Sequence, residues 1–194
     1  MYLVLDTETT GVRGDVRLVQ LAWQGFNAQR VQISLNNVLI RPEGFVIPPD
    51  ATAVHGITTE HALRWGVDLA DALADLRTEI TAVIEPARIL VGHNLTYDLR
   101  VLEGEYRRLH LPSPFDGLPR LDTMLTTVEL CAIPRSMGSG YKWPKLTELY
   151  FVLFDEEFPA HDAGADVAAC ARCLWELQAR GVIELPEGSQ AVAA

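Results

Sequence analysis

The sequence predicts an α/β fold in which short apolar strands alternate with amphipathic helices. Three observations lead to this prediction. The first forty residues contain three strand-like segments joined by short turns and no helical periodicity. Two later apolar runs, near residues 90 and 120, each lead into a segment with helical spacing. A long apolar stripe at helical spacing then follows residue 162.

Length and composition predict one globular domain. The chain has 194 residues, 48% of them hydrophobic and 22% charged, which is enough for a sizeable core. Its formal net charge is −10. This charge argues against a protein that holds duplex nucleic acid by charge alone, although bound metal ions would invert the local electrostatics.

Cysteine usage and hydropathy predict a cytoplasmic protein that does not contact membranes. The three cysteines, Cys131, Cys170 and Cys173, are an odd number in a chain of ordinary size, which favours a reducing compartment over a disulfide framework. Cys170 and Cys173 fall within a helical stripe, so packing is a better interpretation than zinc or redox chemistry. We find no apolar run of transmembrane length, and the chain enters its first strand without a basic leader.

The first strand carries two carboxylates. The apolar run 2–5 predicts a buried strand, and Asp6 and Glu8 follow it two residues apart. In an extended chain such residues project to the same side. Paired carboxylates repel each other unless a cation lies between them. The pattern alone is common, however, and is equally typical of a solvated turn.

Residues 17–24 and 30–40 predict the second and third strands, joined by a turn at 25–29. Alternation of Val31, Ile33 and Leu35 predicts a half-buried face.

The next segments are predicted as a loop followed by two helices. Residues 41–49 are predicted as a Pro- and Gly-rich loop, and His55 follows in a loop beside Gly56, where it is either a ligand contact or a turn residue, with the turn the better interpretation. A short helix is expected near Thr59, and a second, capped by Asp68, is expected to end at Pro86. The apolar positions of this second helix include Leu69, Leu73, Leu76, Ile80, Val83 and Ile84.

Asp98 follows the fourth predicted strand, residues 88–92. Asn94 or Thr96 can cap the helix that begins there, which places Asp98 in its first turn. An aspartate in this position most often stabilises the helix dipole. A strand-to-helix junction also delivers it to the sheet edge where the first strand ends.

A fifth strand is predicted at 120–123, with a helix to about Cys131. The connection 134–144 is rich in Gly and Ser and carries basic and aromatic side chains, which suit phosphates and stacked bases. An ordinary helix connection is an equally good interpretation. A short helix over 145–154 follows.

The last helix begins at Asp162, a good N-cap. Its spacing brings His161 and Asp166 to one point beside the helix start, and the small residues 163–165 allow close packing there. Gly181 ends the helix, so we expect a domain over residues 1–181 and a loose tail over 182–194.

Four carboxylates and one histidine therefore stand at the ends of predicted elements. Four acidic oxygen ligands suit two Mg²⁺ or Mn²⁺ ions of a phosphoryl-transfer site. A histidine can accept a proton near neutral pH and so activate water. The residues are Asp6, Glu8, Asp98, His161 and Asp166.

In their order along the chain, these motifs resemble the DEDDh (DnaQ-like) family of 3′–5′ exonucleases, which includes polymerase proofreading subunits and ribonuclease T. The resemblance covers about residues 1–180 and includes the segments 54–58 and 121–123. The run 141–146 is similar to that of a bacterial or phage subgroup. Tyr97 stands where the family most often has Phe, at a packing position.

The resemblance implies a ribonuclease-H-like fold with a mixed five-stranded sheet, its first three strands an antiparallel meander and the others parallel, flanked by helices. It assigns Asp6, Glu8 and Asp166 to one metal ion, and Asp6 with Asp98 to a second. His161 would deprotonate the attacking water, and the products would be nucleoside 5′-monophosphates. Substrate contacts would come from four further residues: Thr7, Asp50, His55 and Asn94, the last supporting the site.

The expected partner is a single-stranded or frayed 3′ end, DNA rather than RNA, and a polymerase is a further candidate. The alternatives are an exoribonuclease that trims RNA, a non-catalytic module that binds strand ends or a polymerase, and a phosphatase acting on small nucleotides.

Overall fold

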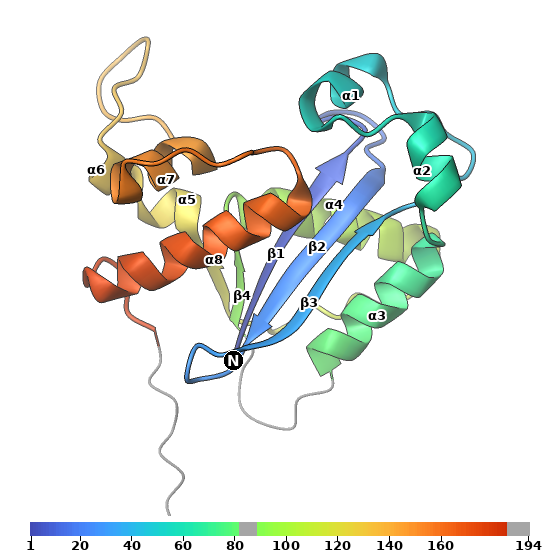
Figure 1. Cartoon of the computed structure of the whole chain (residues 1–194), viewed down its shortest axis with the longest axis horizontal. Helices are drawn as coiled ribbons and strands as arrows, with labels where there is room; N and C mark the ends of the chain where they lie inside the picture. The colour runs from blue at the N-terminus through green and yellow to red at the C-terminus, as the bar shows by residue number, and fades with distance from the viewer. Residues whose placement is uncertain (82–88, 186–194) are drawn as a thin grey trace, which may run out of the picture.

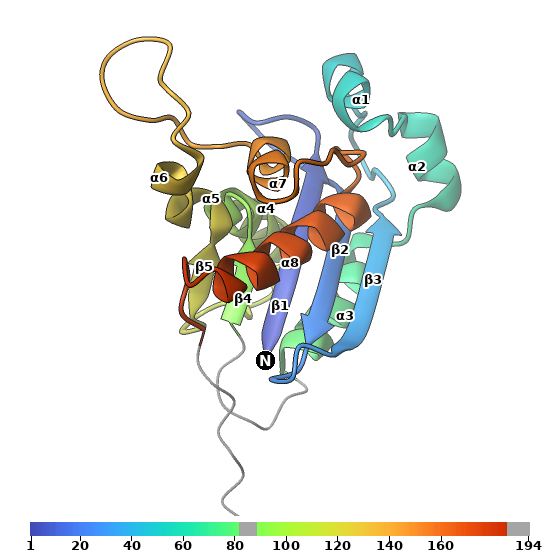
Figure 2. The ribbon, with the colours of Figure 1, turned by 60° about the vertical axis from the view of Figure 1, so that its left-hand side comes forward.

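The computed structural model describes residues 1–81 and 89–185. Its centre is a five-stranded sheet with the strand order β3-β2-β1-β4-β5 (Figure 2). The first three strands pair antiparallel, whereas β1, β4 and β5 run parallel, so the predicted mixed sheet is confirmed. The strands are β1 (Tyr2–Thr9), β2 (Leu18–Phe26), β3 (Gln32–Leu39), β4 (Ile89–Gly92) and β5 (Arg120–Asp122).

Helices cover both faces of the sheet (Figure 1). One face packs against α3 (Leu69–Thr81) and α4 (Leu95–Arg108), and the other against α7 (Leu146–Phe154) and α8 (Ala163–Ala179). The predicted end of α3, with Val83, Ile84 and Pro86, lies outside the described residues. The short helices are α1 (Pro49–His55), α2 (Thr59–Trp65), α5 (Thr123–Thr126) and α6 (Val128–Cys131).

Side-chain alternation divides β1 between the two helical layers. Leu3 and Leu5 pack in the α3–α4 layer, and Val4 packs in the α7–α8 layer. Asp6 and Glu8 continue the even-numbered series, so they emerge on the α8 side of the sheet. The prediction of a buried strand that turns two carboxylates to one side is confirmed.

The predicted face of the third strand is wrong. Val31, Ile33 and Leu35 are 57%, 49% and 61% exposed. Leu35 pairs with Gln24, which pairs with Val4, so this face of β3 is on the α8 side of the sheet. It stays uncovered because β3 is the edge strand and α8 packs mainly over β1 and β2.

The expected loop around residue 55 contains a helix. α1 starts after Pro48 with Pro49 at its first position and ends at Gly56, which has φ 74°. Proline at the start and glycine just past the end are typical helix boundaries. His55 is therefore the last residue of a helix and not a turn residue.

One further boundary differs from the prediction, since the helix expected up to Cys131 is interrupted at Thr127 and forms α5 and α6. Ile183 and Leu185, which fall within the predicted tail 182–194, are buried in the α7–α8 core. The rest of that segment, residues 186–194, lies outside the described part of the chain. A search of the described residues finds no helix with the length and hydrophobicity needed to span a membrane.

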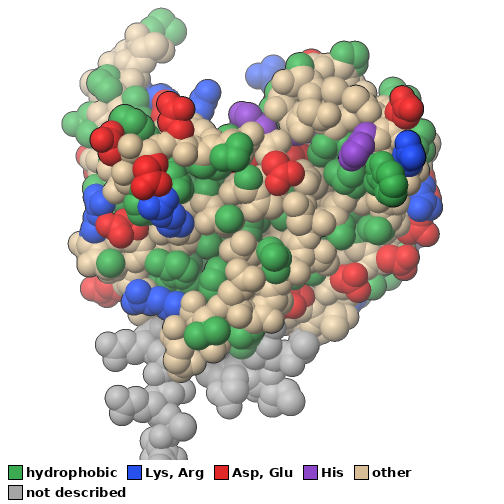
Figure 3. All heavy atoms as spheres, viewed as in Figure 1, with side chains coloured by type: hydrophobic (Ala, Val, Ile, Leu, Met, Phe, Trp, Pro, Cys, Tyr) green, Lys and Arg blue, Asp and Glu red, His purple; other side chains and the backbone are tan. Residues whose placement is uncertain are grey.

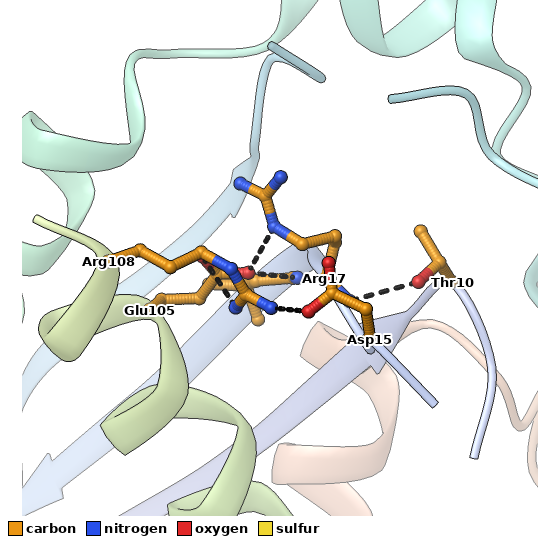
Figure 4. A network of polar contacts seen from close by, with 6 residues as sticks. Thr10, Asp15, Arg17, Glu105 and Arg108 are labelled. Atoms are coloured by element: carbon orange, nitrogen blue, oxygen red, sulfur yellow. Dashed lines mark hydrogen bonds and ion pairs between the residues drawn. The ribbon is translucent and has the colours of Figure 1, made fainter. Parts of the chain in front are cut away.

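A buried glutamate holds the connection between β1 and β2 (Figure 4). Glu105 of α4 is 1% exposed, and its Oε1 accepts hydrogen bonds from Arg17 Nε (3.0 Å) and from the backbone N–H of Leu18 (2.9 Å). Arg108 lies 3.4 Å from the other carboxylate oxygen and also pairs with Asp15. This acid is therefore neutralised by two arginines of the protein.

Candidate active site

Three carboxylates meet where β1 ends and α8 begins. Oxygen atoms of Asp6, Glu8 and Asp166 all lie within 4.8 Å of one another. Asp6 and Glu8 share the α8 face of β1, and Asp166 lies in the first turn of α8. The sheet therefore supplies two of the ligands and the helix above it supplies the third.

The start of α8 fixes His161 relative to Asp166. The Asp162 side chain caps the helix by accepting a hydrogen bond from the N–H of Ala165 (3.0 Å), as predicted. The backbone N–H of His161 donates to Asp166 Oδ2 (2.8 Å), and the imidazole is exposed. His161 adopts φ 69°, which turns the chain sharply before the helix. The predicted convergence of these two residues is confirmed.

A buried glutamine of β2 clamps the same helix start. Gln20 Nε2 donates to Asp162 Oδ2 (2.9 Å), and its Oε1 accepts from the N–H of Ala163 (3.1 Å). A Cβ atom on Gly164 would lie 2.4 Å from the Asn37 side-chain nitrogen, so a larger residue here would displace the Asn37 amide, which accepts a hydrogen bond from Gln20 (2.9 Å). Gln20 could not be predicted from the sequence, because its position opposite Glu8 becomes informative only once the β1–β2 register is known.

Asp98 reaches the site from the other side of the sheet. It is buried in the first turn of α4, and its Oδ1 accepts a hydrogen bond from Thr7 Oγ1 (2.6 Å). Thr7 points away from Asp6 and Glu8 because neighbouring residues of a strand face opposite sides. Thr7, predicted as a substrate contact, uses its hydroxyl to hold Asp98 and also borders the cleft.

Burial raises the pKa values of all four acids, and neighbouring carboxylates of the cluster raise those of Asp6 and Glu8 further. Burial, followed by the charges of Asp98, Asp166 and Glu8, raises the pKa of Asp6 well above its ordinary value. Burial is also the main cause that raises the pKa of Glu8 to about 7 and that of Asp98 to about 7. The pKa of Asp166 is raised by burial too. Four acids are thus held together against their mutual repulsion.

A divalent cation fits this cluster. Within residues 1–81 and 89–185, no lysine or arginine forms an ion pair with any of the four carboxylates. Carboxylate oxygens are the ligands that hard cations such as Mg²⁺ prefer, and a bound cation would offset the repulsion. The donor set therefore has the chemistry of a metal centre.

The cluster lies in a cleft of about 520 Å³. Figure 3 shows the surface hollowed between the lobe that carries α6 and α7 and the lobe of α1 and α2. The cleft is bordered by the acidic cluster, by the start of α4 and by the segment before α7. Its lining residues are Asp6, Thr7, Glu8, Val12, His93, Asn94, Tyr97, Met124, Trp143, Pro144, Lys145, Leu146, His161 and Asp166.

Of the predicted substrate contacts, Thr7 and Asn94 line this cleft, whereas His55 and Asp50 do not. Asn94 occupies the N-cap position of α4, one of the two predicted for the cap, in the left-handed conformation (φ 71°), and its side chain makes no capping bond. His55 accepts a hydrogen bond at Nδ1 from Ile57 N (3.1 Å), and its buried Nε2 has no partner among the described residues. Burial lowers the pKa of His55, and the charge of His161 contributes to the shift. Asp50 is exposed in the first turn of α1, outside the cleft lining.

His93 also lines the cleft and was not predicted as a site residue from the sequence. Its Nε2 lies 2.9 Å from the carbonyl oxygen of Pro144, and its Nδ1 lies 3.0 Å from Thr123 Oγ1. A carbonyl can only accept, so Nε2 carries a hydrogen. Burial lowers the pKa of His93, and the Thr123 hydroxyl also donates to the Gly92 carbonyl (3.1 Å). His93 thereby ties the end of β4 to the segment before α7.

Tyr97 holds the loop that follows β1. Its hydroxyl donates to the carbonyl of Gly11 (2.7 Å) and lies 2.7 Å from Thr9 Oγ1. The Tyr97 hydroxyl thus takes part in hydrogen bonds, whereas the sequence predicted only a packing role for this position.

The ribonuclease-H-like sheet and its acidic cleft are the features of a nuclease that hydrolyses phosphodiester bonds. Residues 3–174 match the family model RNase_T, described as an exonuclease. The chain belongs to this exonuclease family, and the resemblance noted from its motifs is confirmed.

Relatives and solved structures agree with this assignment. An uncharacterised exonuclease, CP81, of Escherichia phage 186 is 29% identical over 154 residues, which are 75% of this chain and 71% of that protein. A PolC-type DNA polymerase III of Streptococcus thermophilus is 29% identical over 177 residues, 90% of this chain but 11% of the polymerase. Exonuclease I of E. coli, solved with a dT13 oligonucleotide, has the same fold with a TM-score of 0.76 at 22% identity, over 92% of this chain and 41% of that one.

Proposed function

We propose that this protein is a metal-dependent 3′–5′ exonuclease that removes nucleoside 5′-monophosphates from the 3′ end of DNA. The observation that carries the proposal is the acidic cluster of Asp6, Glu8 and Asp166, with Asp98 behind it. These acids are not neutralised by a lysine or arginine of the described chain, and an exposed histidine stands at their edge.

Asp6, Glu8 and Asp166 would hold one divalent cation, and Asp6 with Asp98 a second, Mg²⁺ or Mn²⁺ in each case. When bound, such ions supply Lewis-acid stabilisation of the attacking and leaving oxygens in a phosphoryl displacement. Thr7 keeps Asp98 in place through its 2.6 Å hydrogen bond, and Gln20 keeps the α8 start against β2.

His161 acts as the general base. Its backbone N–H is bonded to Asp166 and its ring is exposed, so the imidazole stands beside the metal ligands and remains accessible to water. The ring takes a proton from a water molecule as the water oxygen bonds to phosphorus. The bond between phosphorus and the 3′ oxygen of the preceding nucleotide breaks, and that oxygen takes a proton from solvent water. A 5′-monophosphate and a new 3′ hydroxyl result.

The preference for DNA 3′ ends rests on similarity. Exonuclease I of E. coli has been solved with dA16 and dT13 oligonucleotides, and one relative is a DNA polymerase. The chain spans 40% and 11% of those proteins, so their partners are carried over here as part of the proposal. Asn94 and His55 would contact the terminal nucleotide, and Asp50 would lie further out. A polymerase would bind the surface of this domain.

The decisive experiment follows a 5′-labelled oligonucleotide with Mg²⁺, Mn²⁺ or EDTA. We expect a ladder that shortens from the 3′ end, mononucleotide products, no reaction in EDTA, and a rate at least roughly 10³-fold lower after Asp6→Asn. Asp116→Asn, which changes an exposed acid outside the cleft, is the matched control. A reaction that persists in EDTA, or that Asp6→Asn leaves near the wild-type rate, would refute the mechanism. Matched RNA substrates decide between deoxyribonuclease and ribonuclease, and faster turnover of RNA would refute the DNA assignment.

A further inference from the structure

The segment between α6 and α7 folds back on itself as a short hairpin. Pro134 and Tyr141 form an antiparallel bridge, the N–H of Arg135 donates to the Gly140 carbonyl (3.2 Å), and that of Lys142 to the Ile133 carbonyl (2.9 Å). Figures 1 and 2 show it projecting beyond the helices on one side of the site. The Gly- and Ser-rich connection therefore has a defined backbone.

The basic residues of this segment differ in whether their side chains already have partners within the protein. Lys142 Nζ lies 2.5 Å and 2.6 Å from the two carboxylate oxygens of Glu148, so its charge is neutralised. Arg135 Nε is used within the hairpin, on the Tyr141 carbonyl (3.0 Å). Lys145, in contrast, is exposed and lines the catalytic cleft.

Trp143 lines the same cleft with its side chain 64% exposed. Its backbone is anchored, because the next residue, Pro144, is buried and its carbonyl accepts the hydrogen bond from His93. An indole ring is thus presented to solvent by a fixed backbone, within the cleft that holds Asp6 and Glu8. An exposed ring face in such a place is unpartnered in the free protein and is available for stacking.

We propose that Trp143 stacks on a base of a single-stranded substrate, upstream of the nucleotide being removed, while Lys145 contacts a phosphate of the same strand. This inference rests on the proposed exonuclease function. Stacking on an aromatic ring accepts every base and needs a base face that is free of its neighbours, as in a single strand. The charged ammonium supplies the phosphate contact that the acidic cluster cannot.

The test compares a long substrate with a one-nucleotide substrate. Variants Trp143→Ala and Trp143→Phe are assayed on a single-stranded oligodeoxynucleotide and on the p-nitrophenyl ester of thymidine 5′-monophosphate. For Trp143→Ala, we expect KM on the oligonucleotide to rise roughly 5- to 150-fold with little change in kcat. Turnover of the ester should stay at the wild-type level, and Trp143→Phe should restore most of the lost affinity.

Trp65→Ala is the matched control, because Trp65 is 62% exposed on α2 and does not line the cleft. It should behave as wild type on both substrates. A wild-type oligonucleotide KM in Trp143→Ala, or an equal loss on both substrates, would overturn the proposal.

A binding measurement separates this inference from the proposed function. Anisotropy of a labelled single strand in EDTA reports affinity without turnover. There Trp143→Ala should weaken binding, and Lys145→Ala should reduce the dependence of log affinity on log salt concentration by about one unit. If the wild type degrades neither substrate, the exonuclease proposal fails. If the strand binds equally well to Trp143→Ala, the stacking proposal fails.

Discussion

The molecule contains one buried glutamate and one cluster of four buried or half-buried acids, and their charges are balanced in opposite ways. Glu105 is held between two arginines and a backbone N–H, at the far end of the loop that follows β1 (Figure 4). Asp6, Glu8, Asp98 and Asp166, at the near end, share no ion pair with a lysine or arginine of the described chain.

The two arrangements differ in the source of the counter-charge. A buried carboxylate that supports the fold is stabilised when the protein supplies its counter-charge, as Arg17 and Arg108 do for Glu105. A cluster of carboxylates that repel one another lowers stability unless a cation from solution joins it. The proposed function explains the second arrangement, because a metal site needs acids that the protein itself does not neutralise.

The largest expected effect is that of Asp6→Asn. Lewis-acid stabilisation amounts to several kcal/mol, and each 1.36 kcal/mol is a factor of ten, so kcat should fall roughly 10³- to 10⁵-fold. The metal-free protein should become more stable, because one repelling charge is removed. Kinetics and thermal unfolding in EDTA measure the two effects. If Asp6→Asn were inactive but less stable than the wild type in EDTA, repulsion within the acidic cluster would not be what destabilises the metal-free protein.

His161→Ala should lower kcat by roughly 10² to 10⁴ through loss of the general base, while metal affinity survives. Only the backbone N–H of His161 contacts a metal ligand, and alanine keeps that N–H. Titration calorimetry with Mn²⁺ and steady-state kinetics make the measurement, with His61→Ala on α2 as control. A lost metal affinity would argue against this division of roles.

Glu105→Gln should lower stability and leave activity nearly unchanged, which is the reverse of the result expected for Asp6→Asn. The amide keeps the shape but leaves Arg17 and Arg108 without their shared charge, so we expect a loss of about 1–3 kcal/mol in the free energy of unfolding. Activity at a temperature where the variant is folded should stay near wild type. Urea unfolding followed by circular dichroism is the measurement. A kcat that falls as much as in Asp6→Asn would remove the distinction between the two acidic groups.

The pH dependence of stability in EDTA is a finer test. The folded-state pKa of Glu8 is raised from 4.5 to about 7, and that of Asp98 from 3.8 to about 7. A raised pKa means that the folded protein holds protons that the unfolded chain releases, so the stability present below about pH 4 is lost as pH rises to about 7. Unfolding temperatures measured across that range should therefore fall with pH in EDTA. Excess Mg²⁺ should restore them at the upper end, and Asp6→Asn should weaken the slope. Unfolding temperatures that do not change with pH in EDTA would contradict the raised pKa values of Glu8 and Asp98.

The sequence predicted the residues whose positions follow from local geometry. Strand alternation places Asp6 and Glu8 on one side, and the N-cap at Asp162 places His161 near Asp166. Contacts between distant segments could not be predicted in this way. Gln20 and the α8 start are more than 140 residues apart, and His93 meets the Pro144 carbonyl 51 residues on. The exposed face of β3 depends on where α8 crosses the sheet, which the strand's own alternation cannot reveal.

The smallest effect is expected from Tyr97→Phe, which tests whether the two acidic groups are linked through the loop between β1 and β2. The loop is held at one end by the Glu105 network and at the other by the Tyr97 hydroxyl on Gly11. Removing the hydroxyl, which is bonded to both Gly11 and Thr9, should lower stability by about 0.5–1.5 kcal/mol for each hydrogen bond lost. Because the ring itself remains on the cleft wall, KM and kcat should change less than about twofold.

A double-mutant cycle of Tyr97→Phe with Glu105→Gln measures the link. Independent anchors should give stability losses that add within about 0.5 kcal/mol. A larger deviation from additivity would show that the loop couples Glu105 to the acidic cluster at the end of β1. The loop between β1 and β2 would then connect Glu105 to the acidic cluster, even though only Glu105 is neutralised by arginines. Glu105 would be one of the residues that position the site.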